Sequence, residues 1–531
     1  MKRRDFIATT LATGSALTLH PYIAKSNPIR SSKVQSADDF LEDDSIMIII
    51  DLFGGNDGLN TVIPLQQDEY YNLRPNIALK EEDTIRFQSS DLYLHPALVT
   101  NVENDGFLGL LQNRNLAIIE NVGYENYTMS HFRSSDIWAS GIVNTDPSVK
   151  LLDGWLGRYF ASKLDNYPFE IPEHPLGISI GGEVPLEFRS EKGHMGIALT
   201  DPNSFYNLGK GLTPFEDKFK GDSNFEKEFN FIHTIAEQSE IYSQEVKLAF
   251  DKGTNEVNYP TTGLAAKMGL ISKLISGGLK TKVYHLRLSS FDSHVQQMNE
   301  PLSGQHPILL NQLASAISLF MKDATIQGFS KRVAGLTTSE FGRRAYDNGS
   351  RGSDHGASNV MFMFAHDDSI NFGRAGNPPN LSDLDTNGNP RYQFDFRRLY
   401  TDFLETWFGA SETDVEEIFG EPILPMGILK PRVKSGVKNY VFSKGRPGIE
   451  LYPNPVYQSG ECTIRFDLKQ SMYGDVKVFS TDGRVVKHIY NGMLHNGPND
   501  SLKINGLRSG HYMVTLTIDN KRYSAPLNIL K

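Results

Sequence analysis

Apolar runs alternate with amphipathic stretches through residues 40–435 of the chain. The first run, at 46–50, is continuous and mostly β-branched, which is typical of a strand buried on both faces of a parallel sheet. Further predominantly apolar runs predict strands at 116–120, 282–288, 333–338 and 359–365. The stretches between them predict helices at 130–140, 226–249, 308–322 and 397–408. Strands spaced by helices predict an α/β domain with helices on both faces of its sheet.

Short runs that alternate apolar and polar residues fill residues 449–531. Turn signals separate the runs at Thr481-Asp-Gly, Asn505-Gly and Ser509-Gly. Five to seven short strands of this kind predict a small, all-β, immunoglobulin-like sandwich. The basic, glycine-containing stretch that precedes it predicts a linker over 436–448.

The N-terminus has a basic start followed by an uncharged stretch from Phe6 to Leu19. This pattern predicts an export signal over residues 1–28, which is too short to span a membrane. The adjacent Arg3 and Arg4 resemble a twin-arginine signal, and a Sec signal or a short buried helix is the alternative. No other segment has about 18 consecutive apolar residues, so we expect no transmembrane span in the mature chain.

Charge and cysteine content exclude several classes of protein. The 531-residue chain has 63 acidic and 53 basic side chains and a formal charge of −10, which argues against a nucleic-acid binder. Cys462 is the one cysteine, so the chain has no intramolecular disulfide and no cysteine-based metal centre. Any metal must therefore be held by His, Asp and Glu.

Acidic residues follow the first predicted strand. Asp57 lies in a glycine-rich turn and could bind a cation, although a solvated turn with its own hydrogen bond is the alternative. Asp51 competes with it as the functional acid, and the sequence leaves this choice open. In α/β sheets, functional groups gather at the carboxyl ends of the strands, which is where both residues lie.

Acids and histidines also follow the third and fourth predicted strands. Asp292 and His294 are two residues apart, so in an extended chain both point to one side, a workable spacing for two metal ligands. Glu340 and Arg343 come after the fourth strand, where Glu340 could instead cap a helix and Arg343 could pair with it. A stretch rich in Gly, Ser and Asn then allows the backbone to return Asp354 and His355 to the sheet edge. We therefore predict a divalent metal, zinc or manganese, held by Asp57, Asp292, His294, Glu340, Asp354 and His355.

One more motif opens the helix predicted at 130–140. The hydroxyl of Ser130 lies at the positive end of the helix dipole, where an alkoxide or a phosphate is favoured, although Ser at this position commonly only caps the helix. His131 is a candidate ligand, base or packed core residue, and Arg133 follows one turn into the helix.

Seven ordered motifs make residues 45–425 resemble the bacterial family catalogued as domain of unknown function 1501. They are Gly-Gly-Asn-Asp57-Gly-Leu-Asn-Thr, Leu94-His-Pro-Ala-Leu, Ser130-His-Phe-Arg, Asp153-Gly-Trp-Leu, Phe291-Asp-Ser-His, Ser339-Glu-Phe-Gly-Arg and Gly352-Ser-Asp-His-Gly. That family is similar to the alkaline phosphatase superfamily, so the resemblance implies an alkaline phosphatase-like sheet with a nucleophile beside one or two metals.

The resemblance assigns roles residue by residue. It implies Ser130 as nucleophile, Asp57 as the acid after the first strand, and Asp292 with His294 as a metal pair. Glu340 takes a strand-end ligand position, but Phe341 follows where the superfamily has histidine, so a second metal would lack a ligand. The nucleophile motif also differs from that of sulfatases, and the single cysteine lies in the C-terminal module, which disfavours a formylglycine sulfatase.

The C-terminal module resembles the type A sorting domain of the type IX secretion system. The likeness rests on Tyr452-Pro-Asn-Pro, Val478-Phe-Ser-Thr-Asp-Gly-Arg, Leu507-Arg-Ser-Gly-His-Tyr and the run that ends at Lys531. An immunoglobulin-like binding module is the alternative. The resemblance of the N-terminus to a twin-arginine signal implies the twin-arginine translocase as a partner, and that of the C-terminal module implies the type IX machinery. Together they imply passage through the periplasm and release or attachment at the outer surface of a Gram-negative bacterium.

Two functional hypotheses follow. The first is an exported, metal-dependent hydrolase of phosphate or related esters, on a small molecule or glycan, in which Ser130 attacks and Arg133 or Arg343 clamps the anion. The second is a non-catalytic surface or secreted binding protein that keeps the fold.

Overall fold

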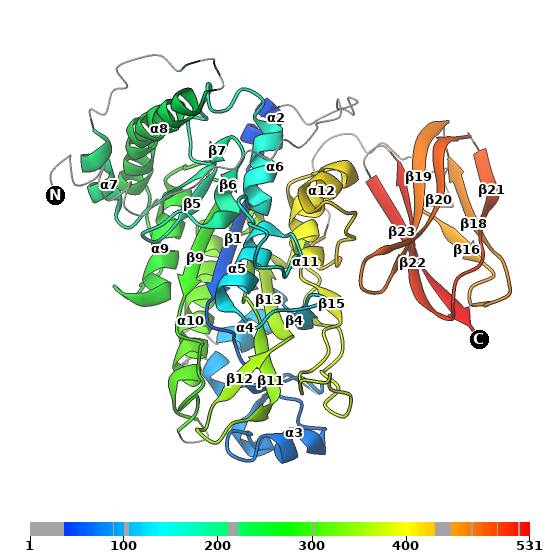
Figure 1. The fold of residues 1–531 in the computed structure, drawn as a ribbon. Coiled ribbons are helices and arrows are strands. Elements are labelled where there is room, and N and C mark those ends of the chain that lie inside the picture. The colour runs from blue at the N-terminus through cyan, green and yellow to red at the C-terminus, as the bar shows by residue number, and fades with distance from the viewer. Residues whose placement is uncertain are drawn as a thin grey trace.

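A computed structural model describes residues 37–88, 90–99, 106–210, 219, 221, 223–299, 302–430, 448–468, 471–495, 497–518 and 521–531. The predicted signal at 1–28 lies outside these residues, as does the predicted linker at 436–448 except for its last residue. The described chain forms an α/β body and, beside it, an all-β C-terminal sandwich (Figure 1). In the described residues no helix is both long and apolar enough to cross a membrane.

The five predicted strands of the body are confirmed and lie in one central sheet. β1 (Ile46–Leu52) pairs in parallel with β9 (Val283–Leu288) on one side and β10 (Val333–Thr338) on the other. β13 (Asn359–Ala365) runs antiparallel to both β10 and β4 (Leu116–Gly123). The full order is β14-β4-β13-β10-β1-β9-β5-β8, and β15 also pairs with β4.

The sheet is therefore mixed, with parallel pairs around β1 and antiparallel pairs around β13. Between β10 and β13 the chain forms a hairpin of β11 (Gly342–Asp347) and β12 (Ser353–Gly356), with no crossover helix between the two strands. Since a parallel return needs such a crossover, β13 starts at the edge where β10 ends and runs back. The stretch rich in Gly, Ser and Asn lies in this hairpin, which places Asp354 and His355 at the sheet edge.

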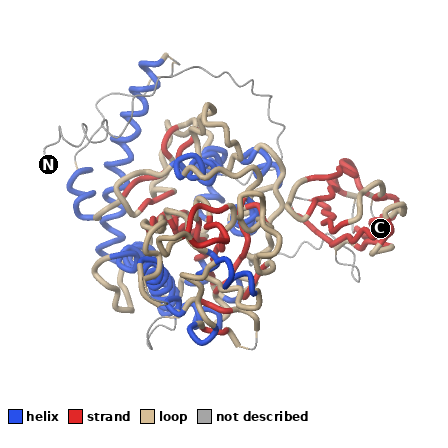
Figure 2. The backbone as a smooth tube through the Cα atoms, turned by 60° about the horizontal axis from the view of Figure 1, so that its bottom comes forward, coloured by secondary structure: helices blue, strands red, loops and turns tan. Residues whose placement is uncertain are grey.

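Alternate residues of β1 pack into two separate cores. Ile46, Ile48 and Ile50 pack with α4, α8, α9 and α10, whereas Met47 and Ile49 pack with α5, α6, α11 and α12. The predicted helices on both faces are confirmed, and Figure 2 shows the strands of the body surrounded by helices. These helices are α4 (Gly106–Gln112), α5 (His131–Ser140), α6 (Trp155–Lys163), α8 (Asn224–Lys252), α9 (Gly263–Ser276), α10 (Gln305–Ile326), α11 (Arg397–Thr401), which continues into a π-helical turn (Asp402–Trp407), and α12 (Glu412–Phe419).

Shorter elements complete the body. The helices are α2 (Ala37–Glu42), α3 (Asp68–Leu73) and α7 (Pro202–Gly209). The strands are β2 (Ile85–Arg86), β3 (Tyr93–Leu94), β5 (Gly177–Ser179), β6 (Arg189–Ser190), β7 (Gly193–His194), β8 (Gly196–Ala198), β14 (Gly373–Ala375) and β15 (Phe394–Asp395).

The C-terminal residues form the predicted sandwich of two sheets. One sheet contains β16 (Glu450–Tyr452), β18 (Cys462–Leu468) and β21 (Gly497–Ile504). The other contains β17 (Val456–Tyr457), β23 (Lys521–Leu530), β22 (Gly510–Ile518), β19 (Met472–Ser480) and β20 (Val485–Leu494). Cys462 is buried in the core between them. The sandwich contacts the body through ion pairs of Lys477 with Glu412 (3.1 Å) and Arg522 with Glu405 (2.9 Å).

Candidate functional site

Five of the predicted site residues converge at the carboxyl edge of the sheet. Asp292 and His294 follow β9, and Glu340 follows β10. His131 is the first residue of α5, and His355 lies on β12 of the hairpin. The parallel strands direct their carboxyl ends to this edge, and the hairpin supplies the last histidine from above it.

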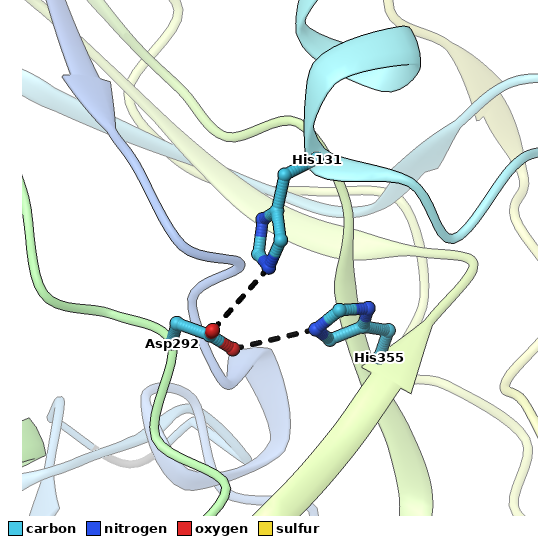
Figure 3. Close-up of side chains that lie close together, drawn as sticks. All are labelled: His131, Asp292 and His355. Carbon is cyan, nitrogen blue, oxygen red and sulfur yellow. Dashed lines mark hydrogen bonds and ion pairs between the residues drawn. The ribbon is translucent and has the colours of Figure 1, made fainter.

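The Asp292 carboxylate lies among three imidazoles. Its Oδ1 is 3.1 Å from His294 Nε2 and 3.3 Å from His355 Nε2, and its Oδ2 is 3.4 Å from His131 Nε2. Figure 3 shows His131 and His355 pointing at Asp292 from two directions. One ligand atom from each of these three residues lies within 4.8 Å of the other two, which is close enough for a shared metal ion.

The Nδ1 atom of each imidazole, which points away from Asp292, faces an oxygen. The pairs are His355 Nδ1 with the Met129 carbonyl at 2.9 Å, His294 Nδ1 with Asp354 Oδ1 at 3.0 Å, and His131 Nδ1 with Glu340 Oε1 at 2.7 Å. An oxygen acceptor at Nδ1 places the proton there and leaves the Nε2 lone pair free, which is the arrangement of metal-bound histidines. The Nε2 atoms of His294 and His355 are 2.9 Å apart, so either one of them carries a proton that it donates to the other, or both lone pairs bind a metal ion.

The charges of the cluster suit a cation. Burial acts to raise the pKa of Asp292, but the hydrogen bond and charge of Arg343 outweigh it, so the pKa is lowered and the carboxylate stays ionised. Burial lowers the pKa of His355, which keeps that imidazole neutral and able to bind a metal. The hydrogen bond to Glu340 raises the pKa of His131. Imidazole nitrogens and a carboxylate are a donor set that fits zinc and also accommodates manganese.

Glu340 connects the cluster to the glycine-rich turn after β1. Its Oε1 accepts a hydrogen bond from the backbone N–H of Gly54 at 2.8 Å, and its Oε2 is buried with no hydrogen-bond partner among the described residues. Gly54 has φ +121°, and a Cβ there would lie 2.2 Å from the Asp292 backbone nitrogen. The turn therefore needs glycine because the two chain segments approach so closely.

The acids after β1 lie outside the histidine cluster. Asp57 Oδ2 forms a fully buried ion pair with Arg74 Nη1 at 2.6 Å, and Gln297 also donates to Oδ2. The structure therefore places Asp57 in a structural pair and not among the metal ligands that the sequence predicted. Asp51 pairs instead with Arg287 Nε at 2.8 Å.

The two predicted clamp arginines donate to main-chain oxygens. Arg133 donates to the carbonyls of Asn144 (2.8 Å) and Val149 (2.7 Å), so it holds a loop. Arg343 is buried and donates to Asp292 Oδ1 at 3.0 Å and to the carbonyls of Gly54, Gly55, Phe291 and Ser353. Neither guanidinium group is free to clamp an anion.

Sequence reasoning missed Arg344. Its side chain is 37% exposed and its Nη1 lies 3.8 Å from Asp354 Oδ2. With Met129, Tyr346 and His355 it lines an open cavity of about 760 Å³ next to the histidine cluster. The period-2 alternation of β11, which buries Arg343 and exposes its neighbour, is the signal that could have found it.

Ser130 is the N-cap of α5, as predicted, and is exposed. Its hydroxyl accepts from the Arg133 backbone N–H at 3.5 Å. Its two chain neighbours, Met129 and His131, both contact the cluster, so Ser130 lies next to the cluster along the chain.

The comparisons with known proteins agree with the two predicted families. Residues 216–419 match the family described as Protein of unknown function (DUF1501), and residues 450–529 match the Secretion system C-terminal sorting domain. Both family predictions are therefore confirmed over these residues. The sorting domain indicates secretion to the cell surface or outside the cell. A search of curated proteins finds no match to the chain.

The search of solved structures finds several proteins that share a low similarity with the chain. The alkaline phosphatase of the Antarctic bacterium TAB5 is 11% identical over 60% of this chain and 92% of its own, with a TM-score of 0.27. A sulfatase-type protein from a glycosaminoglycan-metabolism locus of Bacteroides thetaiotaomicron is 8% identical over 91% and 90%, with a TM-score of 0.31. The lipoteichoic acid synthase LtaP of Listeria monocytogenes is 7% identical over 64% and 72%, with a TM-score of 0.22.

Proposed function

We propose that this protein is an exported, divalent-metal-dependent hydrolase of phosphate or related esters. The observation that carries the proposal is the set of three imidazoles whose Nδ1 atoms face oxygens and whose Nε2 atoms face Asp292. This set fits a resident divalent ion. The sorting domain supports action at or beyond the cell surface, after export that would begin with the predicted twin-arginine signal.

Each residue has a distinct role in this proposal. Asp292, His131, His294 and His355 would hold the metal, which when bound supplies Lewis-acid stabilisation of charge on the ester oxygens. The Ser130 oxygen would bond to phosphorus as the ester oxygen departs with the proton that the serine gives up. A water would then release the phosphate and restore the serine. A further part of the substrate would lie in the 760 Å³ cavity, where Arg344 could bind an anionic oxygen.

One observation favours the second candidate, a non-catalytic surface or secreted binding protein. Arg133 and Arg343 are both occupied by main-chain carbonyls, so neither predicted clamp can bind an anion, and Arg344 beside the cluster is only half-exposed. A binding protein could keep the metal for structure and have no use for a clamp.

Metal content and hydrolysis together test the proposal. We expect one or more equivalents of divalent metal by inductively coupled plasma mass spectrometry, and turnover of aryl phosphate or aryl sulfate with zinc or manganese added. His294→Ala and His355→Ala should lose the metal, whereas His488→Ala, which changes an exposed histidine of the C-terminal sandwich, should keep it. Metal-free protein with no turnover would refute the proposal.

The nucleophile needs its own comparison. Ser130→Ala should lower kcat by at least about 10³-fold while metal content stays constant. Ser148→Ala changes an exposed serine whose hydroxyl donates to Asp146, and this matched control should retain wild-type kcat. Bound metal with no turnover in the wild type would favour the non-catalytic alternative.

A further inference from the structure

A second, smaller cavity adjoins the histidine cluster. It has a volume of about 150 Å³ and is lined by the end of β1, the outer face of α5, the 183–187 loop, Arg287 and the end of β10. Glu340 contacts His131 with one oxygen and also lines this cavity, so it borders both sites. Cavities that enclose whole ligands measure roughly 300–1,000 Å³, so this one suits a single group of a larger substrate.

The lining of the cavity is strongly acidic. We call it the acid pocket, after its carboxyl side chains Asp51, Asp136, Glu183, Glu187 and Glu340. Two arginines, Arg189 and Arg287, oppose these five, which leaves a formal excess of three negative charges.

Two of these carboxyl groups form no close ion pair. Burial raises the pKa of one of them, Asp136, and the charges of Arg133 and Arg189 act against that rise. Asp51 and Glu183 share Arg287, at 2.8 and 3.5 Å. Among the described residues, by contrast, no ion pair involves Asp136 or Glu187. Glu340 is only 2% exposed, and its Oε2 has no hydrogen-bond partner in the described chain. Buried carboxyl oxygens without donors are costly, so a ligand that donates hydrogen bonds would stabilise this arrangement.

The carboxyl groups are too dispersed to hold a single metal ion. Within the described ranges, the residues whose ligand atoms lie within 4.8 Å of one another form two groups, and neither includes a carboxyl side chain of the acid pocket. The groups are His131 with Asp292 and His355, and His366 with Asp367 and Asp368. A molecular cation with several N–H donors matches dispersed acceptors better than an ion does.

We propose that the acid pocket binds a primary ammonium group of the substrate, whose ester group would lie at the histidine cluster. The inference rests on the proposed function for the reacting ester, and it adds the substrate class: phosphate or related esters of amino alcohols or amino sugars. Phe53 contacts one residue of each site, since its ring lies 4.8 Å from the Arg287 guanidinium carbon and 5.8 Å from the His131 ring.

The electrostatics of the pocket agree with a cationic ligand. Burial raises the pKa of Glu187 to about 7 and that of Asp51 to about 6. A bound ammonium would lower both values, because it stabilises the charged carboxylates.

Direct binding of an isosteric pair tests the inference without any need for hydrolysis. Metal-free protein is titrated calorimetrically with 2-aminoethanol and with ethane-1,2-diol, which differ by an ammonium in place of a hydroxyl. We expect 2-aminoethanol to bind at least about tenfold more tightly than ethane-1,2-diol, because one hydrogen bond to a charged group contributes about that difference in affinity. Asp136→Asn/Glu187→Gln should remove this preference, and the exposed Glu82→Gln is the control that should retain it.

Each outcome decides the matter. An amine preference that disappears in the pocket variant and survives in His294→Ala supports the inference, even if the protein hydrolyses no ester. Equal affinity for the two ligands overturns it, as does a wild-type preference retained by Asp136→Asn/Glu187→Gln. Loss of a divalent ion from the pocket variant would show a second metal site and would also overturn it. Asp136→Asn and Glu187→Gln measured singly, with circular dichroism melts, exclude misfolding as the cause.

Discussion

The buried ion pair of Asp57 and Arg74 separates a structural role of Asp57 from the metal-binding role that its motif suggested. Both side chains are 0% exposed, and their charged atoms are 2.6 Å apart. Arg74 also donates to Asn60 Oδ1 (3.0 Å) and to the carbonyls of Ala345 (2.9 Å) and Arg344 (2.8 Å). The guanidinium group thus ties the turn after β1 to the hairpin that carries His355. Burial acts to raise the pKa of Asp57, but Arg74 lowers it by more, so the carboxylate is charged in the folded protein.

Arg74→Met leaves that carboxylate buried without its partner. Removing one member of a buried pair costs about 3–5 kcal/mol. A body of roughly 400 residues unfolds with an entropy of about 0.8 kcal/mol/K, so a loss of about 4 kcal/mol lowers Tm by about 5 °C. Asp57→Leu in the same chain removes the stranded charge, so the double variant should be less destabilised than the sum of the single variants.

Calorimetry and metal analysis measure the two roles separately. Arg86→Met changes an exposed arginine and should shift Tm by less than about 1 °C. Asp57→Asn should lower Tm and keep the metal, whereas Asp292→Asn should lose the metal. The reasoning would be refuted if Arg74→Met melted within about 1 °C of the wild type, or if Asp57→Asn lost the metal at an unchanged Tm.

Three further predictions concern the body and its contact with the sandwich. Burial raises the pKa of Asp402 to about 7, so the folded state keeps a proton that the unfolded chain releases from about pH 4 upward. The free energy of unfolding therefore falls as pH rises from about 4 to about 7. Asp402→Asn should flatten the slope of Tm against pH over this range, and equal slopes for the variant and the wild type would contradict the prediction. Gly54→Ala should weaken metal binding by about 10–100-fold, because its Cβ would lie 2.2 Å from the Asp292 backbone nitrogen. In the control Gly349→Ala, the Cβ would meet nothing within 4 Å, so the affinity for metal should stay unchanged. Glu412→Lys reverses the charge that faces Lys477, so X-ray scattering should report a larger radius of gyration, and an unchanged curve would show that the contact does not hold the domains together.

Local pattern determined the elements of this protein. The apolar run at 46–50 became β1, and the alternation at 449–531 became the sandwich, because burial on one or two faces imposes a period that a short segment displays by itself. The same logic placed Asp292, His294 and Glu340 at one edge, since the parallel strands before them end there. Ser130 was predicted as an N-cap because the preference of that position is local.

Partners that are distant in sequence decided the rest. Asp57 is removed from the ligand set by Arg74, and Arg133 and Arg343 are occupied by carbonyls that no motif reveals. The direction of β13 and the place of His355 depend on a hairpin that folds over the sheet edge. His131 was a ligand, a base or a core residue in the sequence, and only its contacts with Asp292 and Glu340 place it in the cluster. A residue's type and spacing state what chemistry it can do, but the side chains packed against it in the fold determine which of its atoms remain free to do it.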